Sequence, residues 1–108
     1  MNVLFICSRN KWRSRTAETI FKNNQTHTIR SAGTESEARI RVTEKLINWA
    51  DLIFVMEKRH KERLTDRFGV LMDDKDVVIL NIEDNYQYMD AELIEIIRIS
   101  ISPYITLE

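Results

Sequence analysis

The only cysteine of the chain, Cys7, is followed six residues later by Arg13. A thiolate is a strong nucleophile, and a guanidinium can hold two oxygens of a phosphate with paired hydrogen bonds. Together they can bind a phosphoryl group and attack it. Because 10 of the 108 residues are Arg, the spacing alone is a weak signal, and the surrounding elements must decide its meaning.

Those elements predict an anion site. Residues 2–7 form an apolar run of strand length, and residues 14–23 have the apolar spacing of an amphipathic helix. The polar stretch 8–12 then joins the carboxyl end of a strand to the start of a helix. Free backbone N–H groups in such a loop bind phosphate, and the same positive potential favours the thiolate form of Cys7.

The rest of the chain continues the alternation of strand and helix. Further strands are predicted at 27–31, 52–56 and 77–82, and further helices at 43–50, 58–67 and from Asp90 onward. This order predicts an α/β fold, a three-layer open sheet of four parallel strands with helices on both faces. Ligands of such sheets bind beyond the carboxyl ends of the strands, where Cys7 stands.

Composition narrows the class of protein. The length fits a single domain, residues 1–108, and no apolar run exceeds five residues, so no membrane association is expected. One cysteine excludes an internal disulfide and a zinc site built from several thiolates. We expect no metal and no cofactor, because Arg13 and the start of the helix after Cys7 already supply positive charge. Three cations, Arg9, Lys11 and Arg13, interrupt the N-terminal apolar run, which argues against a signal peptide and for a cytoplasmic protein.

The net charge of −1 hides an asymmetry. Residues 1–67 carry 14 Lys and Arg against 8 Asp and Glu, a sum of +6, whereas residues 68–108 carry 2 against 9, a sum of −7. A basic half attracts phosphate-bearing partners of any kind. Because the acidic half belongs to the same body, charge alone does not indicate a nucleic-acid-binding protein.

Four patches in order resemble a known family. They are the run from Cys7 to Ser14 with Asn10 inside it, Ser31-Ala32-Gly33-Thr34, Ala50-Asp51-Leu52-Ile53, and Asp84-Asn85-Tyr86. The pattern resembles the low-molecular-weight protein tyrosine phosphatases, as a short bacterial-type relative with the phosphatase loop between the first strand and the first helix. The resemblance covers the first third of the chain and two shorter stretches.

The resemblance implies a phosphate monoester hydrolase, in the first place a protein tyrosine phosphatase. Cys7 would form a phosphocysteine intermediate, Arg13 would hold the phosphate oxygens, and Asp84 would act as general acid and base. Asp90 is the alternative to Asp84, although its place before the last helix favours a capping role. The partners would be a phosphotyrosine protein or another phosphate monoester, and inorganic phosphate, sulfate or vanadate would occupy the loop.

The resemblance also implies the residues around the substrate. They are Ser8, Arg9, Asn10, Lys11, Trp12, Ser14 and Tyr86. Ser14 would donate its hydroxyl to the thiolate, and Asn10 would hold the loop in shape. Trp12 and Tyr86 are candidate rim aromatics, although Trp12 could equally pack in the core. Arg9 occupies a usual Gly position, so its side chain either points outward or strains the backbone.

Two other function classes remain open. A non-catalytic module that binds phosphate or nucleic acid would use the basic segment with Trp12 as a stacking platform, but it would need neither Cys7 nor Asp84. Nucleic acid is therefore the less favoured partner. An arsenate reductase of the same fold needs further cysteines, which this chain lacks. His60, on an apolar stripe, is interpreted as a boundary residue and not as a ligand or base.

Overall fold

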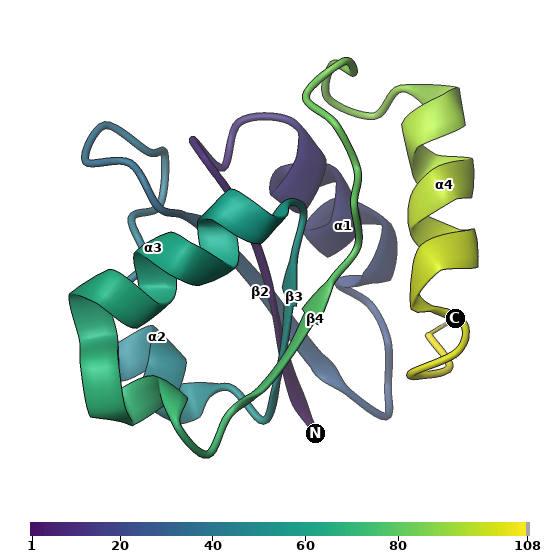
Figure 1. Cartoon of the computed structure of the whole chain (residues 1–108). Helices are drawn as coiled ribbons and strands as arrows, with labels where there is room; N and C mark the ends of the chain where they lie inside the picture. The colour runs from purple at the N-terminus through teal and green to yellow at the C-terminus, as the bar shows by residue number, and fades with distance from the viewer. Residues whose placement is uncertain (108) are drawn as a thin grey trace.

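The computed structural model, which describes residues 1–107, has four strands and four α-helices with one short 3-10 helix (Figure 1). In chain order they are β1 (Asn2–Cys7), α1 (Arg13–Phe21), β2 (Thr28–Gly33), α2 (Glu44–Trp49), β3 (Leu52–Val55), α3 (Lys58–Phe68), η1 (Gly69–Met72), β4 (Asp76–Ile79) and α4 (Ala91–Ile101). The strands form one parallel sheet in the order β2-β1-β3-β4. The predicted fold class is therefore confirmed. Within residues 1–107, no helix is long and apolar enough to cross a membrane.

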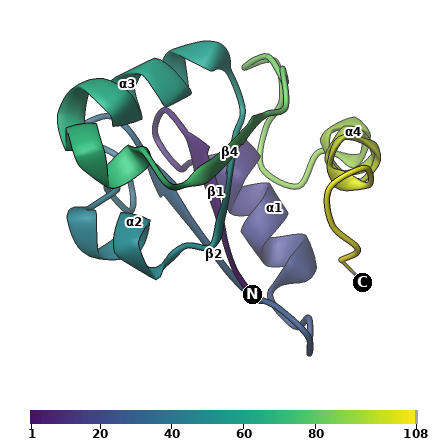
Figure 2. The same ribbon diagram turned by 60° about the horizontal axis from the view of Figure 1, so that its bottom comes forward.

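The helices cover both faces of the sheet, and Figure 2 shows α1 and α4 on one side and α2 and α3 on the other. The central strand β1 is buried on both faces because its side chains alternate between two apolar clusters. Leu4 and Ile6 point to the α2 and α3 side, whereas Phe5 points to the α1 and α4 side and stacks on Phe21 and Phe54.

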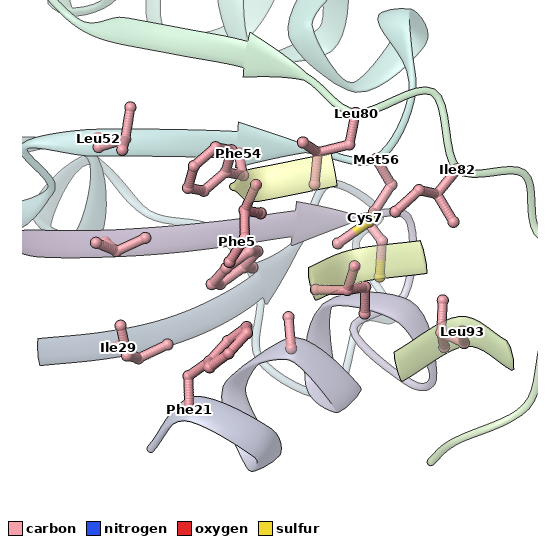
Figure 3. Packing of buried hydrophobic residues seen from close by; sticks show 14 residues of the cluster. Phe5, Cys7, Phe21, Ile29, Leu52, Phe54, Met56, Leu80, Ile82 and Leu93 are labelled. Carbon is pink, nitrogen blue, oxygen red and sulfur yellow. The ribbon is translucent and has the colours of Figure 1, made fainter. Parts of the chain in front are cut away.

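Cys7 belongs to the same apolar cluster as Phe5, on the α1 and α4 side of the sheet. Figure 3 shows it at the carboxyl end of β1, beyond Phe5 and beside Met56 and Ile82. Only 3% of the residue is exposed. The strand therefore delivers the sulfur to the edge of the core, at the end of the sheet where the following loop begins.

Two strand ends differ from the sequence prediction by two residues or more, and the other strand boundaries agree with it within one residue. β2 continues to Gly33, because Ala32 and Gly33 pair with the last two residues of β1 and do not begin a turn. β4 ends at Ile79 instead of residue 82, since Asn81 has a φ of 57°, which no regular strand accommodates. The predicted helix caps Thr43 and Asp90 both accept backbone hydrogen bonds.

Gly33 is the point where β2 meets the loop after β1. A Cβ atom at this position would lie 2.6 Å from the carbonyl oxygen of Ser8 and 2.9 Å from the carbonyl carbon of Arg9. Both are backbone atoms, so no side-chain rotation relieves the contact. A residue without a side chain is therefore required for the 8–12 loop to lie where it does.

Gly33→Ala is expected to destabilise the fold by about 3 kcal/mol, because the backbone of the loop must move to admit the methyl group. Gly69→Ala is the matched control, since its φ of 54° strains an alanine but no atom lies within 4 Å of the added carbon. The control should cost less, about 1–2 kcal/mol, because only backbone strain opposes it. Urea unfolding of both variants measures the difference, and equal losses would contradict the contact at Gly33.

Candidate active site

The 8–12 loop surrounds a cavity of about 300 Å³ beyond the carboxyl end of β1. Its lining consists of Cys7, Ser8, Arg9, Lys11, Trp12, Arg13, Glu35, Arg59 and Asp84. The fold thus gathers the end of β1, the start of α1, and the segments that follow β2, β3 and β4. The three predicted catalytic residues, Cys7, Arg13 and Asp84, all lie in this lining.

The sulfur of Cys7 receives two polar contacts on its inner side. Its Sγ lies 3.2 Å from the backbone nitrogen of Asn10, which donates to it, and 2.9 Å from Oγ of Ser14. These contacts hold the sulfur in place at the end of β1, with the cavity on its other side. The surroundings of Cys7 are therefore those of a nucleophile and not only of a buried apolar side chain.

A chain of hydrogen bonds directs the Ser14 hydroxyl to that sulfur. The side-chain amide of Asn10 donates to Oγ of Ser14 at 2.7 Å and to Oγ of Ser31 at 2.8 Å. Ser31 in turn donates to the carboxylate of Glu18. Because Ser14 accepts from Asn10, its own proton is available to Cys7 at 2.9 Å, and the carbonyl of Ala32 at 3.4 Å is the more distant acceptor. In this arrangement Asn10 has a φ of 55°, a strained conformation that Asn tolerates better than most residues.

Asn10 and Ser14 therefore do not contact the cavity, contrary to the predicted role of both in substrate binding. Each is fully buried beneath the loop, with 0% of its surface exposed. Their contacts are with the sulfur and the loop backbone. The sequence prediction that Ser14 faces the thiolate and that Asn10 holds the loop in shape agrees with these contacts.

Arg13 is buried at the back of the cavity and is held from two sides. Its Nη1 donates to the Glu57 carboxylate and, at 2.8 Å, to the carbonyl of Ile82, while its Nε lies 3.6 Å from Oδ1 of Asp84. Burial raises the pKa of Glu57, but hydrogen bonds from Arg59 and Arg13 outweigh it and lower the pKa overall. Glu57 is therefore an anionic clamp on Arg13.

A buried histidine holds the other end of the loop. The backbone N–H of Glu57 donates to Nδ1 of His60 at 3.0 Å, so the proton of the neutral ring is on Nε2, which donates to Oγ of Ser8 at 2.9 Å. Burial, and then the charges of Arg13 and Arg59, lower the pKa of His60 to about 3. Neutral His60 thus positions the residue next to Cys7.

Sequence reasoning missed Glu57 and His60 at the start of α3, and it also missed Glu35 and Arg59 in the cavity lining. The interpretation of His60 as a boundary residue is wrong, since none of its surface is exposed. Glu57 and His60 form a capping box at the start of α3, a pattern of two polar residues three apart that is readable in a sequence. Their contacts with Arg13 and Ser8 join residues 44 and 52 positions apart, which no local pattern indicates.

The rim of the cavity is basic. The side chain of Arg9 is 64% exposed and pairs with Glu35 at 3.4 Å, so it points outward, and its φ is not positive. Trp12 is half-buried, lines the cavity and carries the ammonium of Lys11 5.0 Å above its ring. Of the two positions open for Trp12, the rim is the one observed.

Of the two residues predicted as alternatives for the general acid, only one lies in the cavity lining. Asp84 lines the cavity and is half-exposed, whereas Asp90 caps α4 by accepting from the backbone N–H groups of Glu92 and Leu93. Tyr86 does not belong to the lining formed by residues 1–107, and it packs partly against the core on the α1 and α4 side. Its predicted contact with substrate is therefore not supported by its position in this structure.

The described residues contain no group of three or more His, Cys, Asp or Glu side chains placed to hold a metal ion.

The low pKa of His60 predicts that the free energy of unfolding decreases as the pH falls. The unfolded chain binds a proton at this residue below about pH 6.5, whereas the folded chain does so only near pH 3. Stability is therefore complete above pH 6.5 and declines as the pH falls, by about 2 kcal/mol between pH 7 and pH 5.

Unfolding free energies at pH 7 and pH 5 test this sign. The stability difference of about 2 kcal/mol between the two pH values should disappear in His60→Gln. It should remain in His27→Gln, a substitution at the N-terminal edge of the sheet. An undiminished difference in His60→Gln would place the acid sensitivity elsewhere.

Comparisons with known proteins show which solved structures share this fold. No protein-family model matches the chain, and the curated proteins contain no significant match. Among solved structures, a YwlE mutant from Bacillus subtilis is 25% identical with a TM-score of 0.68, over 91% of this chain and 94% of that one.

Two further structures, with lower identity, carry phosphatase names. A low-molecular-weight protein tyrosine phosphatase from Streptococcus pyogenes has a TM-score of 0.79 at 18% identity, over 97% of this chain and 93% of that one. The tyrosine phosphatase Wzb from Escherichia coli K30, in complex with phosphate, has a TM-score of 0.70 at 19% identity, over 92% and 84%. The chain thus has the fold of the low-molecular-weight protein tyrosine phosphatases, which confirms the resemblance predicted from its sequence.

Proposed function

We propose that this chain, as one domain over residues 1–108, hydrolyses phosphate monoesters through a phosphocysteine intermediate. The observation that carries the proposal is the sulfur of Cys7 at the floor of a cavity, with donors from Asn10 and Ser14 on its inner side and Arg13 and Asp84 at its walls. A non-catalytic anion site would need the cations but not a nucleophile with its own hydrogen-bond donors.

The first step transfers the phosphoryl group to sulfur. The Cys7 thiolate attacks phosphorus, the S–P bond forms, and the P–O bond to the leaving group breaks. Asp84, at the mouth of the cavity, gives its proton to the leaving oxygen. Arg13 and the backbone N–H groups of the loop stabilise the charge on the three other oxygens.

The second step returns the enzyme to its starting state. Asp84, now a carboxylate, takes a proton from a water molecule as that water attacks phosphorus. The S–P bond breaks, phosphate leaves, and Cys7 is again a thiolate. Glu57 occupies Nη1 of Arg13, so Nε and Nη2 are the donors available to the phosphate in both steps.

Phosphotyrosine is the substrate best supported by the rim. Trp12 offers an aromatic face beside the cavity, against which a substrate ring can pack. Two similar structures, 24% and 21% identical, are named arginine phosphatases. A phosphoarginine substrate would bring a guanidinium group among Arg9, Lys11 and Arg59, and this like-charge contact disfavours it.

Hydrolysis of para-nitrophenyl phosphate without added metal tests the nucleophile. The native chain should show turnover that vanadate blocks, and Cys7→Ser should show none, because a serine hydroxyl is not ionised at neutral pH. Thermal unfolding of the variant checks that it folds. Turnover that survives in a folded Cys7→Ser protein would remove the phosphocysteine mechanism.

Two asparagine substitutions separate the acidic candidates. Asp84→Asn should lower turnover about 100-fold, because an amide cannot donate the proton that the leaving group needs. Asp90→Asn should leave turnover within about threefold, because Asn is as good a helix cap as Asp. Measuring kcat for both on para-nitrophenyl phosphate decides the role, and a larger loss in Asp90→Asn would reverse it.

A further inference from the structure

A row of arginines leads away from the active-site cavity along α3. Arg59, Arg63 and Arg67 follow one another at intervals of four residues, and all three are exposed. Arg59 lines the active-site cavity, whereas Arg63 and Arg67 line a second cavity of about 290 Å³ between α3 and residues 34–42.

The two cavities are neighbours. The first is lined by Glu35 and the second by Thr34, which adjoin in the chain, and Arg59 and Arg63 are one helical turn apart. We name the path from Arg59 to Arg67 beside residues 34–42 the arginine groove. It begins at the mouth where a substrate phosphate would enter.

Arg59, at the start of this groove, is paired with Glu57 at 2.8 Å, but the two arginines farther along it have no carboxylate partner among the described residues. Among residues 1–107, no carboxylate oxygen lies within 4.0 Å of Arg41, Arg63 or Arg67, although Asp66 also lines the second cavity. Burial and the nearby charge of Arg41 lower the pKa of Arg67, which shows that the two cations repel each other. A bound anion would relieve that repulsion.

We propose that the arginine groove binds acidic side chains that flank the phosphorylated residue of a peptide substrate. This inference rests on the proposed phosphatase function and names the substrate class of that same site: an extended, acidic phosphopeptide. Arg59 contacts the substrate next to the phosphorylated residue, and Arg63 and Arg67 contact acidic side chains farther along.

The spacing of the arginines fits such a peptide. Residues four apart on an α-helix are separated by about 6 Å along its axis. Alternate residues of an extended peptide, whose side chains share a face, are separated by about 6.6 Å. Acidic side chains at the second and fourth positions from the phosphorylated residue would therefore meet successive arginines.

A peptide fits the groove better than a nucleic-acid strand does. Binding of single strands combines cations with free aromatic faces on which bases stack. Here Lys11 covers one face of Trp12, which leaves a single face for one substrate ring and none for a series of bases, and Arg15 lies 4.4 Å from the centroid of the Tyr88 ring. The acidic Glu35 lies in the lining as well, and it would repel a backbone that carries a phosphate at every step.

The test compares two phosphotyrosine peptides that differ only in charge. One carries Glu at the second and fourth positions on both sides of the phosphotyrosine, and the other carries Gln there. The native chain should have a kcat/KM at least about tenfold higher for the acidic peptide at low salt, with the preference reduced at high salt. The variant Arg63→Gln with Arg67→Gln should lose most of this preference.

Matched controls keep the result specific to the groove. Lys22→Gln with Lys61→Gln removes two exposed positive charges from residues that line neither cavity, and it should retain the preference. Turnover of para-nitrophenyl phosphate should be unchanged in both double variants, because this substrate does not reach Arg63. If both double variants lose the preference equally, the preference depends on the net charge of the protein and the proposed groove is wrong.

The remaining outcomes separate this inference from the proposed function. Turnover of para-nitrophenyl phosphate without any peptide preference would overturn the groove and leave the phosphatase intact. If nothing is hydrolysed, the proposed function fails, and binding of the unphosphorylated acidic peptide to the native chain still tests the groove. Tighter binding of a 5′-phosphorylated oligonucleotide than of that peptide, lost in Arg63→Gln with Arg67→Gln, would overturn the peptide assignment.

Discussion

The contact between the Cys7 sulfur and the donors beneath it is the constraint on which the rest of the structure depends. A sulfur at the end of a strand buried on both faces has its nearest polar partners in the loop that follows, at Asn10 and Ser14. For those partners to reach it, Asn10 must adopt a left-handed conformation and Gly33 must lack a side chain. Strain at one residue and the absence of a Cβ at another are thus consequences of placing donors around a single atom.

A second layer of contacts comes from α3 and determines which groups face the cavity. The capping box of this helix satisfies its own backbone and also leaves Glu57 to hold Arg13 and His60 to hold Ser8. One helix start therefore anchors both ends of the loop. Because Arg13 is almost completely buried, removing its anionic partner would leave an unpaired charge in the interior, so the clamp is also structural.

The charges divide between the floor and the rim of the site. Arg13 is paired at the floor with Glu57 and lies near Asp84, whereas the cations around the mouth extend along α3 with few partners. In the proposed function, the paired charges at the floor would serve any phosphate ester, since they would contact the group common to all of them. Arg63 and Arg67, which have no carboxylate partner among residues 1–107, would contact what differs among substrates in the proposed groove, so selectivity is expected to depend on α3 and not on the loop.

The sequence by itself determined the order of the elements, the parallel sheet and the loop of Cys7 and Arg13, because these follow from local patterns: apolar runs, helical spacing, and the caps Thr43 and Asp90. Only the tertiary structure decided that Glu57 and His60 belong to the site, that Asp84 and not Asp90 reaches the cavity, and that Tyr86 turns to the core. These outcomes depend on contacts between residues 44 and more positions apart, whose geometry is fixed by the packing of α3 and of the segment after β4 against the sheet. A local pattern carries no information on which side chains meet across that distance, and this is the physical reason why the elements and most of the cavity lining could be predicted, whereas the contacts of Glu57 and His60 could not.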